Sequence, residues 1–592
     1  MSIYTAPLTD MLFQLKLAMQ KAGIQDMPDF ADYDEDILAA ILEEASKFAS
    51  GELSALYRIG DEQGVSFSDG KVTTPDGWQS AYQQFCENGW MGLALPEEYG
   101  GQNLPKFISQ PVNEMWLSAN LAFIMFQTLA QGSCEILMKF GTQDQQERYM
   151  PKLVSGEWGA AMALTEPQAG SDLGVISTKA VPQDNGTFLI KGQKVFISYG
   201  EHDLTDNIVH MVLARTPDAP AGSRGISLFA VPTKRIDEHG QLGADNDVVC
   251  SGIEHKLGLH GSPTCSISYG DNDACFGELI GEENQGLKAM FVLMNEARLS
   301  VGMQGVALGQ YGYQQALEFA LERKQGNHYL TGEKGVEIVQ HPDVARMLLS
   351  IRSEVFALRS LGYTLAALID CSESHGNADI RNQALERIAL LTPVFKAYST
   401  ERLNTMAGTA VQIFGGMGFV EETGIAQLMR DARITTIYEG TTAVQAKDLA
   451  FRKIMADAGT GMQSLAADML ASARQLAEMN TWASQAEQLI AAISRFDSVT
   501  KDKLLTDDMD LLQVNAGAVA YLEAFGALCC AWQYADIVIA CEDTDLTAVA
   551  AGEEYNYRSM ARFYFAHGLP KLHASLDAFE QADNGLMDYK FG

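Results

Sequence analysis

The chain has 592 residues, of which 47% are hydrophobic and 20% are charged. This is an ordinary balance for a globular protein with about three or four packing units. The 42 basic and 76 acidic residues leave a net charge of −34. Such a surface repels nucleic acid and anionic lipid, so neither is an expected partner. An anionic ligand would need a local exception lined with Arg, Lys or backbone amides.

The nine cysteines are scattered without a Cys-x-x-Cys pair, which fits a reducing compartment. The start, MSIYTAPLTD, lacks the basic and apolar regions of a signal peptide. The most apolar late stretch, Ala516–Cys541, is interrupted by Glu523 and Asp536, which argues against a membrane span. We therefore expect a cytoplasmic protein without stable membrane insertion.

Hydrophobic periodicity divides the chain into successive regions. Apolar residues three and four apart predict helices from Asp10 to about Gly156. Between about Trp158 and Leu279, short β-branched runs bounded by Gly, Asn and Pro predict strands. Helical periodicity returns near Gly281 with one long element, for which Gly326 and Asn327 look like a C-terminal stop.

A small, flexible segment, Ala456–Gly461, predicts a hinge before a further helical block that begins near Met462. The order of helices, strands and helices does not suit a doubly wound βαβ fold, in which strands and helices alternate throughout. The predicted domains are residues 1–157, 158–280, 281–456 and 462–592.

Two stretches of the strand region have the composition of ligand loops. Ala163–Gly174, ALTEPQAGSDLG, can bring backbone N–H groups close to a flat or anionic ligand, although a surface turn explains its composition too. In Lys191–Ser198, KGQKVFIS, Phe196 and Ser198 fall on one face of a strand. An aromatic and a hydroxyl so placed could cover a ring and bond to its edge. Core packing explains Phe196 equally well.

A glycine-rich stretch follows a helical run in Ala410–Ile434. Gly415, Gly416 and Gly418 suit a backbone that phosphate or ribose approaches closely. Their GGxG spacing is not the dinucleotide fingerprint of a Rossmann fold. A helix C-cap with a tight turn is the alternative interpretation.

The stretch Ile437–Ile454 places an acidic residue at a helix start. Glu439 and Gly440 precede a helix that is expected near Thr442, where Thr442 and Gln445 have capping-box spacing. A carboxylate there is stabilised as the anion and need only serve the helix dipole. A base for a carbon acid instead needs a partly apolar pocket, for which Tyr438 supplies an aromatic wall. The spacing leaves both interpretations open.

Other chemistries have weaker support. There is no GxSxG motif of a serine hydrolase and no GxxxxGK[ST] phosphate loop. His255 and His260 lack neighbours at metal-ligand spacing, so no metal site is expected. Arg323 and Lys324 end the long helix, where cations suit the dipole and need no ligand.

Taken in this order, these stretches resemble the acyl-CoA dehydrogenase family over about Asn88–Ile454. The motifs concerned are ALTEPQAGSDLG, KVFIS, ERKQG, IFGGMGF and MRDARITTIYEGTTAVQ. The resemblance implies a mostly α fold with a helical N-terminal domain, a β-barrel-like middle domain and a four-helix C-terminal domain, with FAD between them. The longer N-terminus and the appended helical domain after Met462 resemble an enlarged bacterial branch of the family.

The resemblance also implies a role for each matching position. Glu439 is the base, and its backbone N–H helps to hold the thioester oxygen. The positions implied to contact FAD are Met162, Leu164, Thr165, Phe196, Ser198, Arg323, Gln412, Gly415, Gly416 and Thr441. Those implied to contact the acyl-CoA are Ser171, Asn295, Arg298, Tyr438 and Gly440. The adenosine contacts often come from a neighbouring subunit, which implies a homodimer or homotetramer.

Some positions depart from the family pattern. Phe196 stands where tryptophan is usual, Ser198 replaces a threonine, and Asn295 replaces an acid. A subset of the family carries its base one residue before the arginine equivalent to Arg298. That residue is alanine here, and the acid is displaced to Glu296, about 100° around the helix. Glu439 is therefore the expected base.

The implied reaction is α,β-dehydrogenation of an acyl-CoA to a trans-2-enoyl-CoA, with electrons passed to electron-transfer flavoprotein. A medium- to long-chain fatty acyl group is favoured, and 3-(methylthio)propanoyl-CoA is the alternative substrate. An acyl-CoA oxidase, a nitroalkane oxidase or flavin monooxygenase, and a helical scaffold without FAD are the rival functions. The floor of the acyl pocket is expected on Leu117–Gln131 and Met290–Met294.

Overall fold

The computed structural model describes residues 3–25, 27–583 and 585–590, and the side chains of Val292, Leu293 and Asn295 lie outside the described part. The chain forms two compact units. The first unit contains the chain up to Lys47, Lys106–Ser118 and the chain from Val301 onward. The second unit contains Phe48–Pro105 and Ala119–Ser300.

The second unit combines helices with a sheet. Its helices are α3 (Ser54–Gln63), α4 (Trp78–Glu87), the later part of α5 (Lys106–Phe140), α6 (Gln143–Val154) and the first turns of α7 (Gly286–Glu322). Asn120 has non-helical backbone angles inside α5, and its side chain accepts a hydrogen bond from the amide of Phe123 at 3.1 Å. The later part of α5 therefore has its own N-terminal cap.

A small hairpin interrupts the predicted helical N-terminal region. It joins β1 (Ser66–Ser68) to β2 (Lys71–Thr73). Asp69 and Gly70 at its tip both have positive φ, of 52° and 79°. An Asp-Gly pair is a strong hairpin signal, so the sequence contained this element although helical periodicity obscured it.

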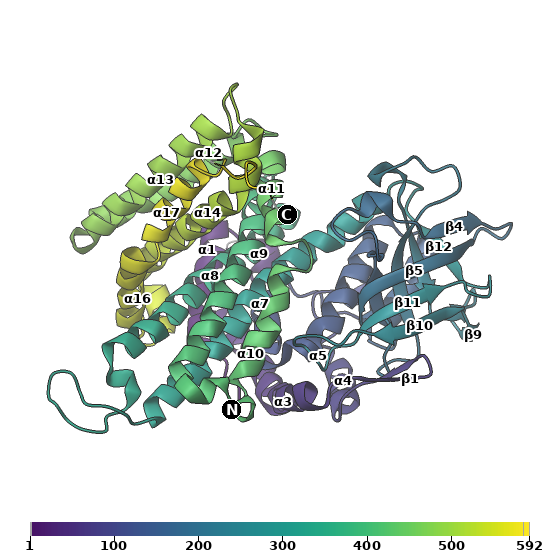
Figure 1. Ribbon diagram of the computed structural model, residues 1–592, viewed down its shortest axis with the longest axis horizontal. Coiled ribbons are helices and arrows are strands. Elements are labelled where there is room, and N and C mark those ends of the chain that lie inside the picture. Colours follow the sequence, from purple (N-terminus) through teal and green to yellow (C-terminus); the bar gives the residue numbers. More distant parts are fainter. Residues whose placement is uncertain (1–2, 26, 584, 591–592) are drawn as a thin grey trace. The chain divides into compact units, whose positions relative to one another are not determined.

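Eight strands form the main sheet, in the order β10-β11-β5-β12-β7-β6-β3, with β4 beside β5. Strands β4, β5, β10, β11 and β12 of this sheet are labelled in Figure 1. The strands are β3 (Gly159–Ala163), β4 (Lys179–Pro182), β5 (Phe188–Ser198), β6 (Ile208–Ala214), β7 (Ser227–Pro232), β10 (Val248–Ile253), β11 (Thr264–Tyr269) and β12 (Phe276–Ile280). A separate pair joins β8 (Lys234–Ile236) to β9 (Leu242–Asp245). β6 and β7 are buried along their whole length, because both of their faces are covered.

The sheet closes on itself through Arg215, which follows β6. Ala180 of β4 donates its amide to the carbonyl of Arg215 at 2.8 Å, and Arg215 donates its own to Thr178 at 2.9 Å. β4 also pairs with β5, and β5 connects through β12 and β7 to β6. The hydrogen bonds thus form a closed ring of strands, as expected for the predicted barrel-like domain.

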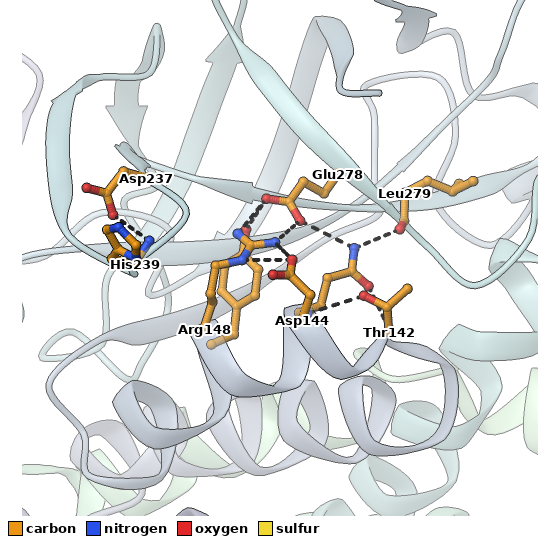
Figure 2. A network of polar contacts seen from close by, with 9 residues as sticks. Thr142, Asp144, Arg148, Asp237, His239, Glu278 and Leu279 are labelled. Carbon is orange, nitrogen blue, oxygen red and sulfur yellow. Dashed lines mark hydrogen bonds and ion pairs between the residues drawn. The ribbon is translucent and has the colours of Figure 1, made fainter. Parts of the chain in front are cut away.

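Helix α6 is fixed to strand β12 by charge-assisted hydrogen bonds (Figure 2). Arg148 donates to both carboxylate oxygens of Glu278, at 2.9 and 2.8 Å, and also to Asp144. Thr142 and Gln145 form a capping box at the start of α6. Such a bidentate pair fixes orientation as well as distance, so the helix has one register against the sheet.

The first unit is helical in its described residues. Its helices are α1 (Leu8–Ala22), α2 (Glu35–Phe48), the first part of α5, the later part of α7, α8 (Pro342–Ser374), α9 (Ala378–Phe414), α10 (Ile425–Ala432) and α11 (Thr442–Lys447). Helix α7 ends at Glu322, four residues before Gly326, so the predicted stop at Gly326 and Asn327 was wrong. Those residues instead belong to a segment, residues 324–337, that folds back on itself. Isolated β-bridges pair Lys324 with Glu337 and Asn327 with Lys334 in this segment.

The C-terminal block of the first unit is α12 (Thr460–Glu478), α13 (Ala483–Lys503), α14 (Leu511–Ala540), α15 (Thr544–Ala550), α16 (Glu554–His567) and α17 (Pro570–Glu580). Helix α14 packs closely on α9: a side-chain carbon added at Gly526 would lie 2.2 Å from the ring of Tyr398. Lys571 of α17 pairs with the buried Glu354 of α8 at 3.0 Å. The predicted mostly α fold, with a β middle region and appended helices, is confirmed.

Within the described part of the chain, three helices, α5, α8 and α14, are long and apolar enough to cross a membrane by length and composition. Their most apolar windows are 78%, 83% and 72% buried within the protein. Glu523 and Asp536 were expected to argue against a membrane span in this region, but α14 still qualifies as one by length and composition. Burial explains its apolar character instead, because its side chains pack against neighbouring helices.

Candidate active site

A turn before helix α11 carries the predicted base. We define the catalytic turn as residues 435–442. Glu439 is half-buried and has φ of 53°, and Gly440 follows with φ of 91°. A glutamate at positive φ is uncommon and costs of order 1 kcal/mol or more unless surrounding contacts fix it. Strain of this kind occurs preferentially at functional sites.

The start of α11 differs from the predicted capping box. Thr441 is the N-cap, one residue earlier than expected, and its hydroxyl accepts from the amide of Val444 at 3.4 Å. The buried Gln445 does not bond back to the helix start. Its amide nitrogen donates to the carbonyl of Glu439 at 3.1 Å. Gln445 thus stabilises the strained residue itself.

Lys396 of α9 lies beneath the catalytic turn. Its side chain is fully buried, and its ammonium donates to the carbonyl oxygens of Gly440 at 2.7 Å and Thr435 at 3.0 Å. Thr442 donates its hydroxyl to Glu401 of the same helix at 2.6 Å. Helix α9 therefore holds the turn at both ends.

Tyr438 is attached to α7. Its hydroxyl donates to the side-chain oxygen of Gln304. Burial and the nearby carboxylate of Glu439 raise the pKa of Tyr438 above its usual value. The hydroxyl therefore stays protonated at neutral pH, and it positions the ring beside Glu439.

The predicted adenosine contacts lie at another corner of the first unit. Phe319 of α7 stacks on Phe414 of α9, with ring centroids 4.2 Å apart, so the C-terminal ends of the two helices meet. Arg323 and Gln412 are exposed near this junction. Gly415 has φ of 60°, and a side-chain carbon added there or at Gly416 would meet nothing within 4 Å. The glycines thus expose backbone in open space.

In the second unit, the predicted flavin loop is anchored by a buried ion pair. Lys194 of β5 and Glu166 are 2.9 Å apart, with side chains 0% and 1% exposed. Lys194 also donates to the carbonyl of Leu164 at 2.9 Å, and Thr165 accepts from the amide of Val195 at 2.9 Å. These bonds hold Leu164 and Thr165, both half-buried, against the strand. Met162 on β3 is also half-buried, and Ser171 is exposed in the loop.

Charge on this pair is maintained at neutral pH. Desolvation acts to raise the pKa of Glu166, but Lys194 and the hydroxyl of Thr178 hold it well below its usual range. Burial lowers the pKa of Lys194 to about 8. Both groups are therefore ionised at pH 7.

Strand β5 has a bulge at Phe196. Lys194 pairs with Ile267 and Ile197 with Cys265, so Val195 and Phe196 together oppose one residue of β11. The bulge breaks the alternation between Lys194 and Ile197, which both face inward. Alternation holds from Phe196 to Ser198, so these two side chains share one face, as predicted. Phe196 has φ of 60° and is 63% exposed, and Ser198 is half-buried. Both lie outside the core, where a ligand can reach them.

The predicted substrate contacts on α7 are partly described. Arg298 is buried, as is Ala297, while Glu296 is half-buried. The side chain of Asn295 lies outside the described residues.

The first unit also contains a cavity of about 360 Å³ among helices that include α8, α9, α12 and α14, with Arg387 and Asp536 in its wall. The residues predicted to bind FAD or acyl-CoA are not among those that line it.

Fold and motifs together define a flavoenzyme class, and the chain belongs to the acyl-CoA dehydrogenase family. It matches the family's N-terminal domain over residues 36–157, its middle domain over 161–271 and its C-terminal domain over 284–454. Residues 451–590 match the acetyl-CoA dehydrogenase C-terminal-like domain. Enzymes of this family are FAD-dependent oxidoreductases.

Relatives span nearly the whole chain. A 3-methylmercaptopropionyl-CoA dehydrogenase of Ruegeria pomeroyi is 41% identical over 91% of both chains. The broad-specificity linear acyl-CoA dehydrogenase FadE5 of Mycobacterium tuberculosis is 32% identical over 99% of both. An acyl-CoA dehydrogenase complexed with FAD from Bacillus anthracis shares the fold, with a TM-score of 0.71 at 21% identity, over 94% of this chain and 90% of its own.

Sequence reasoning missed the residues that support the predicted site. Lys194, Glu166 and Lys396 were not singled out, and Gln445 was assigned to a capping box instead of to the carbonyl of Glu439. A signal existed for Lys396, because a lone lysine in the apolar run LLTPVFKAYS of a helix is a buried charge that needs partners. Lys194 gave a similar signal in its strand. The partners themselves are distant in sequence, so only the fold identifies them.

Proposed function

We propose that the chain catalyses α,β-dehydrogenation of an acyl-CoA thioester with FAD, and that Glu439 removes the α-proton. The observation that carries this proposal is the catalytic turn. It presents a carboxylate at a strained, half-buried position whose flanking carbonyls are bonded to Lys396 and Gln445. A base so fixed has the orientation that proton abstraction from carbon requires.

The residues present fit FAD in their chemistry. The exposed ring of Phe196 suits contact with a flat ring system, and the hydroxyls of Thr165 and Ser198 can bond to its polar edge. Gly415 and Gly416 leave open space where a nucleotide can approach the backbone. We assign the remaining flavin contacts to Met162, Leu164, Arg323, Gln412 and Thr441.

The chemistry that bound FAD supplies is acceptance of the hydride from the β-carbon. The protein removes the α-proton through Glu439, while the Glu439 amide, as the family pattern implies, donates to the thioester oxygen. That donation matters because the α-proton is acidic only while negative charge on the oxygen is stabilised. Tyr438, Gly440, Ser171, Asn295 and Arg298 are the proposed acyl-CoA contacts.

Two acyl classes have support. The sequence favoured medium- to long-chain fatty acyl groups, in line with the similarity to a linear acyl-CoA dehydrogenase. The higher identity to a 3-methylmercaptopropionyl-CoA dehydrogenase favours a short thioether substrate. We give the thioether class precedence because its relative shares more residues over a comparable length.

We further propose a cytoplasmic homodimer or homotetramer that passes electrons to electron-transfer flavoprotein. Lys396 and Gly415 lie about 28 Å apart along α9, at about 1.5 Å per residue. This separation supports adenosine contacts from Gln412, Gly415 and Gly416 to the FAD of a neighbouring copy. The proposed domains remain residues 1–157, 158–280, 281–456 and 462–592.

Anaerobic flavin reduction tests the proposal. Purified protein should show a bound-flavin spectrum that bleaches on mixing with one of the C4 to C16 acyl-CoAs or 3-(methylthio)propanoyl-CoA. Absence of bound flavin would favour the scaffold function. Rapid peroxide release in air would identify an oxidase instead.

A further inference from the structure

We propose that Lys396 is a positioning residue for the reaction: its ammonium fixes the catalytic turn so that Glu439 meets the α-carbon. This inference rests on the proposed function, in which Glu439 is the base. Lys396 belongs to α9, far from the turn in sequence, and its side chain has no exposed surface. It is thus distinct from the groups expected to touch FAD or substrate.

The two carbonyls that accept from Lys396 bracket the base. Thr435 lies four residues before Glu439, and Gly440 follows it directly. An ammonium has three donors and no acceptor, so it can bind both oxygens at once. Bonds from a charged donor are roughly twice as strong as neutral ones. One side chain therefore fixes the turn on both sides of Glu439.

The backbone of Glu439 needs such a constraint. At φ of 53° a glutamate is strained, and relaxation toward the usual negative φ would turn its side chain away. Gln445 restrains the carbonyl of Glu439 only, and Thr441 caps the following helix. Neither reaches the carbonyls of Thr435 and Gly440. The burial of a charge at this position is explained if it holds the turn in one conformation.

Ser399 of α9 offers a matched control. It is also fully buried and lies one turn further along the helix. Its hydroxyl donates to the carbonyl of Gly302 in α7 at 2.7 Å, and among the described residues it makes no hydrogen bond to the catalytic turn. Replacing it with alanine removes a buried hydrogen bond from a neutral side chain to a backbone carbonyl, without loosening the catalytic turn.

The experiment compares Lys396→Met, Ser399→Ala and Glu439→Gln in the full-length FAD-loaded enzyme. In Lys396→Met, we expect flavin reduction to slow by about 10²-fold, because a displacement of about 1 Å can cost that much. Apparent acyl-CoA affinity should change less than about threefold. The isotope effect from α-deuterated substrate should increase, because proton abstraction becomes more rate-limiting. Ser399→Ala should retain the wild-type values.

A second measurement does not depend on activity. Backbone amide hydrogen exchange of residues 435–445 should accelerate in Lys396→Met and not in Ser399→Ala, with FAD content equal to wild type. A folded Lys396→Met enzyme with wild-type reduction rate and exchange would overturn the inference. So would equal effects in the Ser399→Ala variant.

A second variant covers failure of Lys396→Met to fold. In Lys396→Gln the amide can reach one carbonyl at most, so reduction should be slowed, and a wild-type rate would overturn the inference. Failure of the proposed function is distinguishable, because Glu439→Gln would then reduce flavin as fast as wild type. Active wild type, inactive Glu439→Gln and unaffected Lys396 variants would reject the inference alone.

Discussion

The buried ammonium of Lys396 lies 2.7 Å from the carbonyl oxygen of Gly440, the residue that follows the predicted base. Lys396 belongs to the middle of a 37-residue helix, and Gly440 to an irregular turn. A rigid helix thus supports an irregular segment through one charged side chain. Sites supported by regular elements keep their geometry better than isolated loops.

Replacing Glu439 with glutamine should remove the base and keep its shape. We expect FAD to remain bound and anaerobic flavin reduction by acyl-CoA to fall by about 10²–10⁴. Stopped-flow absorbance measures the rate. Glu296→Gln is the control, since Glu296 is the displaced acid of α7, and it should reduce flavin at near the wild-type rate. Loss of activity in Glu296→Gln with retention in Glu439→Gln would reassign the base.

The buried pair of Lys194 and Glu166 should contribute strongly to stability. Lys194→Met leaves a buried carboxylate without its cation, so the free energy of unfolding should decrease by about 3–5 kcal/mol. Lys191→Met on the same strand breaks an exposed pair with Asp273 and should cost much less, because water screens that pair. Urea unfolding of both variants measures the difference. Similar values would show that burial of the Lys194 pair has no energetic consequence.

Buried histidines should make the protein sensitive to acid. Burial lowers the pKa of His210 from 6.5 to about 4, although its hydrogen bond to the carbonyl of Gly200 acts in the opposite sense. Below pH 6.5 the unfolded chain binds a proton that the folded chain excludes until about pH 4. This histidine therefore contributes stability above pH 6.5, and the contribution falls by about 1.4 kcal/mol per pH unit on acidification. Burial lowers the pKa of His202 to about 3, which adds a second such group.

Urea unfolding at pH 7.5, 6.5 and 5.5 tests this dependence. His210→Gln should reduce the loss of stability between pH 6.5 and 5.5, because it removes one of the two buried histidines that cause it. Asp370, whose pKa is raised to about 7 by burial, acts in the opposite direction in both proteins. His239→Gln should leave the slope unchanged, since His239 is exposed. An unchanged slope in His210→Gln would contradict the assignment.

Two helical glycines should respond oppositely to alanine. At Gly526 an added carbon would lie 2.2 Å from the ring of Tyr398, so Gly526→Ala should destabilise the protein by about 1–3 kcal/mol. At Gly408 nothing lies within 4 Å, so Gly408→Ala should stabilise it by up to about 1 kcal/mol. Thermal unfolding of both variants measures the sign. A change in stability of the same sign in both variants would contradict the close packing of α14 on α9.

Much of the architecture could be predicted from local patterns. The periods of 3.6 and 2 distinguish helices from strands, and the motif order identified the family and the β middle region. Errors arose where local signals competed. Gly326 was predicted as a helix stop, but α7 ends at Glu322, and the glycine lies in the folded-back segment between two β-bridged residues, Lys324 and Asn327. The capping box expected at Thr442 was displaced because Gln445 bonds to Glu439 instead.

The sequence by itself determined the element types, the family and the positions that match its motifs, because these depend on residue order and short-range periodicity. Only the tertiary structure revealed what supports those positions. Lys396 meets Gly440, and Lys194 meets Glu166, across intervals that no local pattern spans. A buried charge must be satisfied by some partner, but which one depends on how the helices and strands pack.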